Sequence, residues 1–329
     1  MNSQALPHAP AEARTEASRR AHVRAGSVPT AAARALGLFR IGIAAFGLVQ
    51  LYLLADYLLL LYGNFGLMQW VISETMKVPY MPSVGNLARL LHPYGFSGDQ
   101  CVFLLVGIYT FCLLALLLGW QTRGAAIGAW LCQMTLSNTG FFSLYGVDSI
   151  LHIALFHCAW MPVGNACSVD QGLLGRRPAP PWCTAFALTI LRLHLCLIYL
   201  NTGLAKLNSE QWWNGEAIWR AVMQPQFRQF DWAWLAQVPW LAKLVGWMTL
   251  LIEGGYALFV WPRRTRLWWV GATVLLHLGI GVCLGLWSFS VLMMLLTVSA
   301  FGAGVVEQAV RWLGPLRPRR ARELAIGTG

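Results

Sequence analysis

The sequence predicts an all-α, polytopic integral membrane protein, a helical bundle with about eight transmembrane helices. Three observations support this fold class. Of the 329 residues, 57% are apolar and 11% are charged, whereas a soluble domain carries about 25% charged residues. Apolar runs of roughly 20 residues, the length that spans a bilayer, recur along the chain. The 17 Trp, 15 Phe and 9 Tyr residues suit a chain that lies in or at a membrane. The composition therefore excludes a water-soluble enzyme and a disordered chain.

The apolar runs place the predicted membrane spans. In chain order they cover 36–54, 101–119, 124–143, 147–163, 184–204, 241–261, 267–285 and 287–305. The last two runs form one apolar stretch, which we divide at Gly285–Leu286–Trp287–Ser288. If these two runs were one helix, the protein would have seven spans, and this is the main alternative.

The basic residues predict the orientation. With the N-terminus in the cytoplasm, 16 of the 24 Lys and Arg residues fall on the inner side and six on the outer side, as the positive-inside rule requires. An even number of spans returns the chain to the inner side. We therefore expect a multi-pass protein of the bacterial inner (plasma) membrane with both termini cytoplasmic. It has a disordered Ala/Arg-rich tail over 1–35, a membrane domain over 36–305 and a basic tail over 306–329.

The charged, cysteine and aromatic residues limit the partners and the kinds of site that we expect. The net charge is +11, but the arginines form short clusters between apolar runs, so we expect membrane lipid and no nucleic acid as partner. The eight cysteines contain no CxxC pair and mostly lie in apolar runs, which indicates small buried residues and no metal site. Two long outer segments, 55–100 and 205–240, are rich in aromatic residues. We therefore expect any chemistry near the outer leaflet.

Lys206 is the first candidate for chemistry. It lies at the outer end of the fifth predicted span, and lysine occurs only three times in the chain. Arginine cannot be deprotonated in a protein, whereas a lysine amine desolvated against Trp212 and Trp213 can act as a base. The sequence therefore predicts a catalytic base at Lys206. The alternative is a lysine that extends to the interface as an anchor.

Asp148 and His152 are the second candidates. Their i, i+4 spacing at the outer start of the fourth span places both on one helix face. In an eight-span arrangement Asp148 and Lys206 lie at similar depth on the outer side. We therefore predict that both residues join Lys206 in catalysis. The alternative is an Asp that caps its helix and a buried structural His.

Other polar residues in or near the spans complete the predicted site. The residues expected to bind substrate are Trp212, Trp213, Asn138 and His277. Glu253 and Arg192 are predicted to be structural, because charged groups in a membrane require partners. A pair of Glu253 with either His277 or Arg192 is the expected form of that role.

Five segments in a fixed order carry a family resemblance. They are LLLGWQTRGAA (116–126), MPVGNACSVDQGL (161–173), YLNTGLAKLNSEQWWNG (199–215), LIEGGYALFVWPRRTR (251–266), and His277 followed by Phe289–Ser290. Together they resemble the horizontally transferred transmembrane (HTTM) family, which includes the vitamin K-dependent gamma-glutamyl carboxylase. The resemblance covers about 34–301, nearly the whole membrane domain.

The resemblance implies a function. In the carboxylase a lysine in a G-x-x-K-x-x-x-x-x-W context deprotonates vitamin K hydroquinone, and Gly203, Lys206 and Trp212 resemble that context. An enzyme of the carbon–carbon lyase and epoxidising monooxygenase type is implied. It would use reduced vitamin K or another quinol, with O₂ and CO₂ as co-substrates and a secreted peptide or protein as substrate. The carboxylase also has an Asn–His pair near its fourth span, where this chain has Gly146–Val147–Asp148, and a C-terminal lumenal region that this sequence does not contain.

Two other functions remain open. Some bacterial family members resemble components that mature secreted peptide toxins, so a non-enzymatic membrane partner for maturation or export of a peptide is the alternative. A transporter is weaker, because the two halves show no inverted repeat. The state of Lys206 discriminates between enzyme and partner, since only an enzyme needs an amine that gives up its proton easily.

Overall fold

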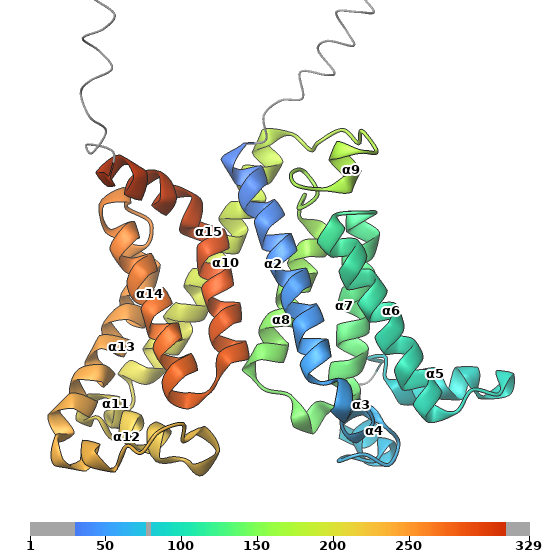
Figure 1. Ribbon diagram of the computed structural model, residues 1–329, viewed down its shortest axis with the longest axis horizontal. Helices are drawn as coiled ribbons and strands as arrows, with labels where there is room; N and C mark the ends of the chain where they lie inside the picture. Colours follow the sequence, from blue (N-terminus) through green and yellow to red (C-terminus); the bar gives the residue numbers. More distant parts are fainter. Residues whose placement is uncertain (1–29, 77–79, 314–329) are drawn as a thin grey trace, which may run out of the picture.

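The structure, a computed structural model, describes residues 30–76 and 80–313, with side chains as far as Gly302. Most of the two predicted tails lies outside these residues. Eight long helices form the bundle in the described part of the chain (Figure 1). They are α2 (Ala31–Leu53), α6 (Gly98–Leu118), α7 (Thr122–Thr139), α8 (Gly146–Trp160), α10 (Pro181–Leu207), α13 (Pro239–Phe259), α14 (Arg263–Leu284) and α15 (Trp287–Leu313). Each overlaps a predicted span, with ends that differ by up to eight residues, and the predicted fold class is confirmed.

Five of these helices are long and apolar enough to cross a bilayer, namely α2, α6, α10, α13 and α14. The part of α15 with described side chains, Trp287–Gly302, is a shorter apolar helix. Helix α8 has 15 residues, about 22 Å at 1.5 Å per residue, whereas the hydrocarbon core is about 30 Å thick. It packs against α2, α7 and α15, so protein replaces lipid along much of its length.

The ends of the helices form two faces (Figure 1). The α9 face is where α2 begins, α15 ends and the short helix α9 (Val169–Gly172) lies. The opposite α11 face carries the short helices of the two long predicted outer segments. These are α3 (Leu58–Tyr62), α4 (Trp70–Met76), α5 (Val84–Leu91), α11 (Glu210–Asn214) and α12 (Glu216–Met223). Both ends of the described chain therefore lie on one face, as an even number of crossings requires.

The boundary between α14 and α15 lies where the sequence predicts it. Helix α14 ends with Gly285 in the left-handed region at φ 71°, and α15 begins at Trp287. A residue with a Cβ is strained at that φ, so glycine permits the tight reversal. The seven-span alternative, with one helix over 267–305, is therefore wrong.

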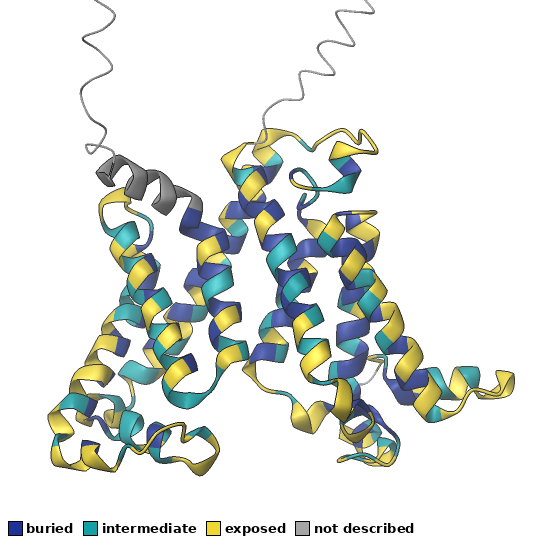
Figure 2. Cartoon of the chain, viewed as in Figure 1, coloured by how far each residue is buried: buried dark blue, intermediate teal, exposed yellow. Residues whose placement is uncertain are grey.

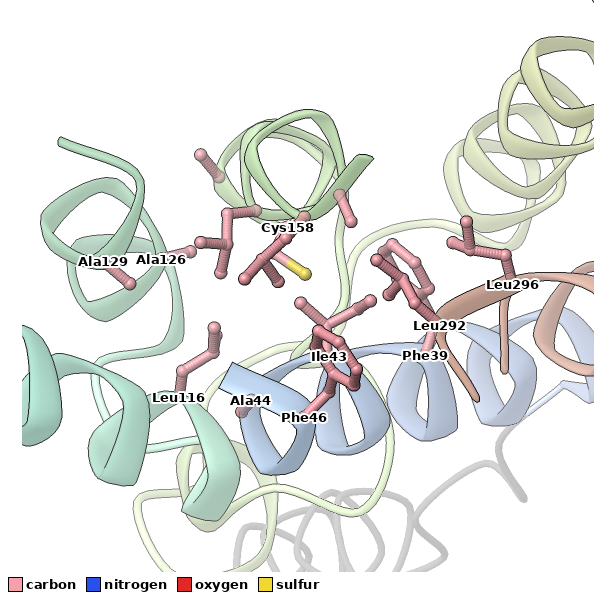
Figure 3. Close-up of a cluster of buried hydrophobic side chains, with 14 of the residues drawn as sticks. Phe39, Ile43, Ala44, Phe46, Leu116, Ala126, Ala129, Cys158, Leu292 and Leu296 are labelled. Atoms are coloured by element: carbon pink, nitrogen blue, oxygen red, sulfur yellow. The ribbon is translucent and has the colours of Figure 1, made fainter. Parts of the chain in front are cut away.

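The core lies around α2, as Figure 2 shows by the buried inner faces of the helices. Phe39 and Ile43 of α2 are fully buried and face side chains of α6, α8 and α15 (Figure 3). The outer faces of the helices instead expose large apolar side chains, such as Phe103 and Phe111 of α6. This pattern suits a bundle whose solvent is lipid.

Arg40 is a charged residue in the middle of that core. Its guanidinium donates hydrogen bonds to the carbonyl oxygens of Leu116, Leu117 (2.8 Å) and Cys167 (2.6 Å). The last carbonyls of a helix lack intrahelical partners and carry partial negative charge. Arg40 therefore caps the C-terminal end of α6 and ties it to the segment before α9.

Candidate functional site

Lys206 and Glu253 form an ion pair between the last turn of α10 and the middle of α13. The Glu253 side chain is 8% exposed and the Lys206 side chain 22%. A pair this far from water survives because each charge is the partner of the other. The expected pairing of Glu253 with His277 or Arg192 is therefore wrong, because the Glu253 carboxylate pairs with Lys206.

Two glycines allow this pair to form. Gly203 of α10 packs against Gly254 of α13, and a Cβ on Gly203 would lie 2.9 Å from the Gly254 Cα atom. Small residues let transmembrane helices approach closely. Since Lys206 lies three residues after Gly203 and Glu253 precedes Gly254, the close approach brings the amine and the carboxylate together.

The tryptophans predicted beside Lys206 come from α11. The Lys206 amine lies 5.2 Å from the centre of the Trp212 ring, in a cation–π arrangement. Trp213 points elsewhere, and its indole N–H donates to the Leu207 carbonyl oxygen at 2.8 Å. Trp247 of α13 in turn donates to the Trp213 carbonyl oxygen at 2.9 Å. Trp213 and Trp247 thus hold α11 in place, while Trp212 contacts the amine.

A second polar group lies two turns further along the same face of α10. The Tyr199 hydroxyl forms a 2.7 Å hydrogen bond with His277 Nε2 of α14, and both side chains are buried. Tyr256 of α13 stacks on Tyr199 with 4.1 Å between ring centres. Within the described residues, four buried polar atoms in this part of the bundle lack a hydrogen-bond partner: Tyr256 Oη, His277 Nδ1, Ser290 Oγ and Thr297 Oγ1. Buried polar atoms normally have partners, so this interior suits a polar guest.

Arg192 contacts the neighbouring helix α15, and its structural role stays a prediction. Its Nε donates to the Ala300 carbonyl oxygen of α15 at 2.7 Å, and its guanidinium lies 5.3 Å from the centre of the Phe301 ring. These contacts join α10 to α15 toward the α9 face. The positive charge of Arg192 is therefore stabilised by a carbonyl oxygen and an aromatic ring, without a carboxylate partner.

Asp148 and His152 have local contacts at the start of α8. Asp148 Oδ2 accepts the Tyr145 N–H at 3.1 Å, which is a helix-capping contact. His152 Nε2 accepts the Trp130 indole N–H at 3.1 Å, which leaves the proton on His152 Nδ1. In Figure 1 the α11-face ends of α8 and α10 lie apart, with the lower end of α15 between them. These are the contacts expected if Asp148 caps its helix and His152 is a buried structural residue. The catalytic role of the two residues stays a prediction.

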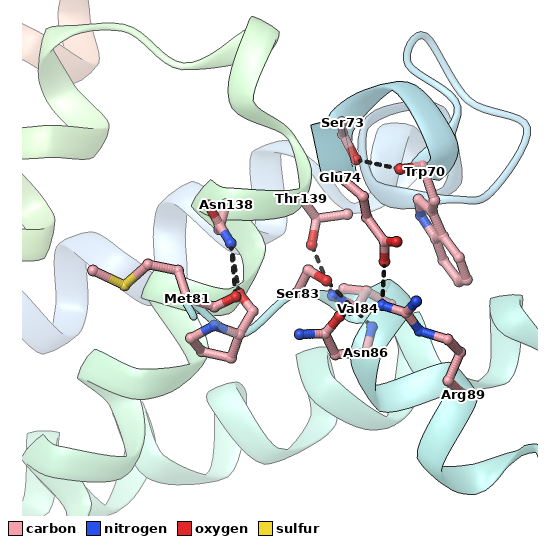
Figure 4. A network of polar contacts seen from close by, with 11 residues as sticks. Trp70, Ser73, Glu74, Met81, Ser83, Val84, Asn86, Arg89, Asn138 and Thr139 are labelled. Atoms are coloured by element: carbon pink, nitrogen blue, oxygen red, sulfur yellow. Dashed lines mark hydrogen bonds and ion pairs between the residues drawn. The ribbon is translucent and has the colours of Figure 1, made fainter. Parts of the chain in front are cut away.

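Asn138 holds the segment before α5 (Figure 4). Its side-chain amide donates to the carbonyl oxygens of Met81 (3.2 Å) and Pro82 (3.0 Å), and the neighbouring Thr139 hydroxyl accepts the Val84 N–H at 2.8 Å. These bonds join α7 to α5, on the opposite side of the bundle from α10 in Figure 1. Substrate binding by Asn138 stays a prediction, and the structure does not bring it together with Lys206.

His157 of α8 and His194 of α10 form a hydrogen bond that joins the two helices. His157 Nε2 lies 2.8 Å from His194 Nδ1, and the Trp160 indole N–H donates to His157 Nδ1 at 3.3 Å. Because His157 Nδ1 accepts a hydrogen bond, Nε2 carries the proton and donates to His194. The similar depth of the two residues in neighbouring spans was the one signal in the sequence for this contact.

A cavity of about 550 Å³ lies beside α13, which we call the lateral cavity. Its walls are mostly apolar side chains of α12, α13 and α14, and Trp232 and Trp234 of the α12–α13 segment also line it. Thr249 and Ile252 of α13 line it, one turn and one residue before Glu253. The sequence did not predict this cavity, because it depends on how α12 folds back over two spans.

Comparison with known protein families agrees with the fold. The family model for the HTTM domain matches residues 32–304, which is most of the chain and includes all eight long helices, with α15 matched as far as residue 304. Comparison with curated proteins and with solved structures gives no match. The chain belongs to the HTTM family, a family of membrane proteins related to the vitamin K-dependent carboxylase.

Proposed function

We propose that this protein is a membrane enzyme in which Lys206 and Glu253 together take a proton from a lipophilic hydroxyl compound of the quinol type. The observation that carries the proposal is the Lys206–Glu253 ion pair between two membrane helices, covered by Trp212. An ionisable pair is costly in a membrane, which makes it a candidate for function.

The pair can act as a base without a net charge change inside the protein. When the proton of the Lys206 ammonium passes to the Glu253 carboxylate, the pair becomes a neutral amine and a neutral acid. The cost of desolvating two charges favours this neutral form more than water would. The amine lone pair then accepts the proton of a substrate O–H group. The resulting ammonium lies beside the substrate oxyanion and stabilises its charge.

The surroundings support a lipophilic substrate. The lateral cavity adjoins α13 and offers apolar walls for a hydrocarbon body, and the unpartnered Tyr256 and His277 atoms offer polar contacts inside the bundle. A quinol, such as reduced vitamin K, combines an acidic O–H with an apolar ring. The O–H suits the polar atoms inside the bundle, and the ring suits the apolar walls of the lateral cavity. Trp212 would hold the ring near Lys206 and exclude water.

The test is oxygen consumption by a reduced naphthoquinone in liposomes that contain the purified protein. Deprotonated quinols react with O₂ faster than their neutral forms, so a protein base accelerates oxygen uptake. Lys206→Arg keeps the positive charge but removes the base. We expect oxygen uptake to fall about 10²–10⁴-fold, the usual contribution of a general base.

Lys243→Arg is the matched control, because Lys243 is exposed at the start of α13. This variant should keep the parent activity. If Lys206→Arg folds normally and is as active as Lys243→Arg, Lys206 is not a base.

A non-enzymatic membrane partner for peptide maturation or export is the second candidate. The observation in its favour is that Lys206 already has a complete ion-pair partner, which is all that a structural link between α10 and α13 needs. For a purely structural link Lys206→Arg preserves the pair, so peptide export would be unchanged. The same variant therefore separates the two functions.

We also propose that the α9 face is cytoplasmic in a bacterial inner membrane. On this face, Arg176 and Arg177 lie in the connection before α10, and the first turns of α7 and α14 carry Arg123, Arg263, Arg264 and Arg266. Positive residues in short loops favour the cytoplasmic side. The longer, aromatic-rich segments of the α11 face would then meet the outer leaflet.

A further inference from the structure

A cavity of about 360 Å³ opens on the α9 face, at the opposite end of the bundle from Lys206. We call it the α9-face cavity. It lies between the start of α7, the segment after α8, α9 and the segment before α10. None of the residues predicted for catalysis or substrate binding lines it.

Hydrogen bonds fix the walls of this cavity. The Asp170 carboxylate accepts the N–H groups of Gln121 (3.0 Å) and Thr122 (2.8 Å) and the Thr122 hydroxyl (2.7 Å). On the far side, the Asn165 side chain donates to the Ala179 carbonyl oxygen and accepts the Ala179 N–H, both at 3.1 Å. These bonds tie the segment between α8 and α10 to the start of α7 and to its own end just before α10, so the cavity is a built feature of the fold.

The charge of the cavity is strongly positive. Arg123, Arg176 and Arg177 line it, against a single carboxylate from Asp170. Arg176 lies 3.6 Å from Asp170 and also donates to the Gln121 side chain at 2.8 Å. Among the described residues, neither Arg123 nor Arg177 forms an ion pair. Two guanidinium groups are therefore available to an anion.

Exposed aromatic side chains on and next to the cavity are those expected at the level of the lipid headgroups. Trp160, at the end of α8, lines the cavity and is 38% exposed. Trp182 and Phe186, in the first two turns of α10, are 70% and 57% exposed. Trp is enriched where a membrane protein meets the headgroup region. Since Trp182 precedes the lining residue Cys183 and Phe186 follows it by one turn, an anion bound here would have an exposed apolar surface close by.

We propose that the α9-face cavity binds the phosphate of an anionic phospholipid, with Arg123 and Arg177 as its ligands and the acyl chains against Trp182 and Phe186. Guanidinium groups bind phosphate oxygens through paired, charge-assisted hydrogen bonds. Basic pockets between membrane helices hold lipid headgroups in this manner. The adjoining exposed aromatic surface favours a lipid over a free phosphate ion. This site is independent of the function proposed for Lys206.

The test is lipid binding to the purified full chain in detergent, followed by native mass spectrometry and by thermal unfolding. The probes are phosphatidylglycerol, phosphatidylcholine with the same acyl chains, and inorganic phosphate. We expect phosphatidylglycerol to bind most tightly and to raise the melting temperature most. The double variant Arg123→Gln/Arg177→Gln should bind it about 30-fold more weakly, from about fivefold for each arginine near an anionic headgroup.

The matched control is Arg263→Gln/Arg264→Gln, which removes two exposed arginines from the same face outside the cavity. It should keep the parent affinity for phosphatidylglycerol. Equal loss in the two double variants would show a general surface attraction and overturn the site. Equal binding of the two lipids would overturn it as well. If inorganic phosphate stabilises the parent as strongly as phosphatidylglycerol does, the ligand is a soluble anion and the lipid assignment is wrong.

Discussion

Gly203 and Gly254 lie in backbone contact where α10 meets α13, so closely that a Cβ on Gly203 would come within 2.9 Å of Gly254 Cα. This contact sets the distance between the two helices. It therefore determines whether the amine of Lys206 and the carboxylate of Glu253 can meet. The glycine of the G-x-x-K segment thus has a packing role that is separate from the chemistry of the lysine.

Gly203→Ala should separate α10 from α13, because the backbone of Gly254 cannot move aside as a flexible side chain can. We expect a loss of about 1–3 kcal/mol in the free energy of unfolding, the usual cost of overpacking. Thermal unfolding in detergent measures it. Gly271→Ala on α14 is the control, because its Cβ would meet no atom within 4 Å. A Gly203→Ala variant as stable as Gly271→Ala would contradict the proposed contact.

The Lys206–Glu253 pair should show strong coupling in a double-mutant cycle. Removal of one partner, in Lys206→Met or Glu253→Leu, leaves an unpaired charge in a membrane helix. We expect each single variant to lose about 3–5 kcal/mol of unfolding free energy. The double variant replaces both charges with apolar groups and should lose less than either single variant. Thermal unfolding of the four proteins measures the coupling, and simple additivity would mean that the two groups do not interact.

Much of the fold could be predicted from the sequence, because only a few kinds of backbone structure can span a bilayer. Apolar runs of sufficient length become helices, and Gly285 marks the reversal that divides the last run into α14 and α15. The scarcity of lysine and the two tryptophans at 212 and 213 also predict a special role for Lys206 beside them. In the structure Trp212 contacts Lys206.

The partners of these residues were harder to predict. Glu253 lies 47 positions from Lys206, and only the packing of Gly203 on Gly254 selects it over other groups at similar depth. Periodicity shows which side chains share a face of one helix, but it does not show which face meets which neighbouring helix. For the same reason Asp148 was predicted beside Lys206 from its depth alone, while its described contact is the cap on Tyr145.

The Tyr199–His277 hydrogen bond should contribute to stability. Tyr199→Phe leaves His277 Nε2 buried without its partner, and such a loss costs about 1–3 kcal/mol. Tyr256→Phe is a matched control, because the Tyr256 hydroxyl is equally buried but has no hydrogen-bond partner in the described part of the chain. We expect its melting temperature to stay at or above that of the parent. Equal losses in the two variants would show that the ring contacts, and not the hydrogen bond, matter.

Orientation in the membrane is directly measurable. With the α9 face in the cytoplasm, reporter fusions placed after Arg34 and after Arg322 should both give a cytoplasmic signal. The positive-inside rule supplies the reason, since 16 of 24 Lys and Arg residues lie on that side in the predicted topology. A fusion after Asn214, in α11, should give the opposite signal. A periplasmic signal after Arg34 would reverse the proposed orientation.

Acid should destabilise the α9 face through Asp170. Burial tends to raise the pKa of this carboxyl, but hydrogen bonds from Thr122 and Gln121 and the charge of Arg176 outweigh it, so the pKa lies below its ordinary value. A carboxyl with a lower pKa in the folded protein contributes stability above its unfolded pKa, about 3.9. That contribution is lost as the pH falls through the folded pKa.

The melting temperature of the parent should therefore drop below about pH 4, while Asp170→Asn, already about 1–3 kcal/mol less stable at neutral pH, should lose less on acidification. Asp99→Asn, at an exposed position on the α11 face, controls for the removal of a carboxylate. Parallel pH profiles for the parent and Asp170→Asn would show that Asp170 does not hold the start of α7.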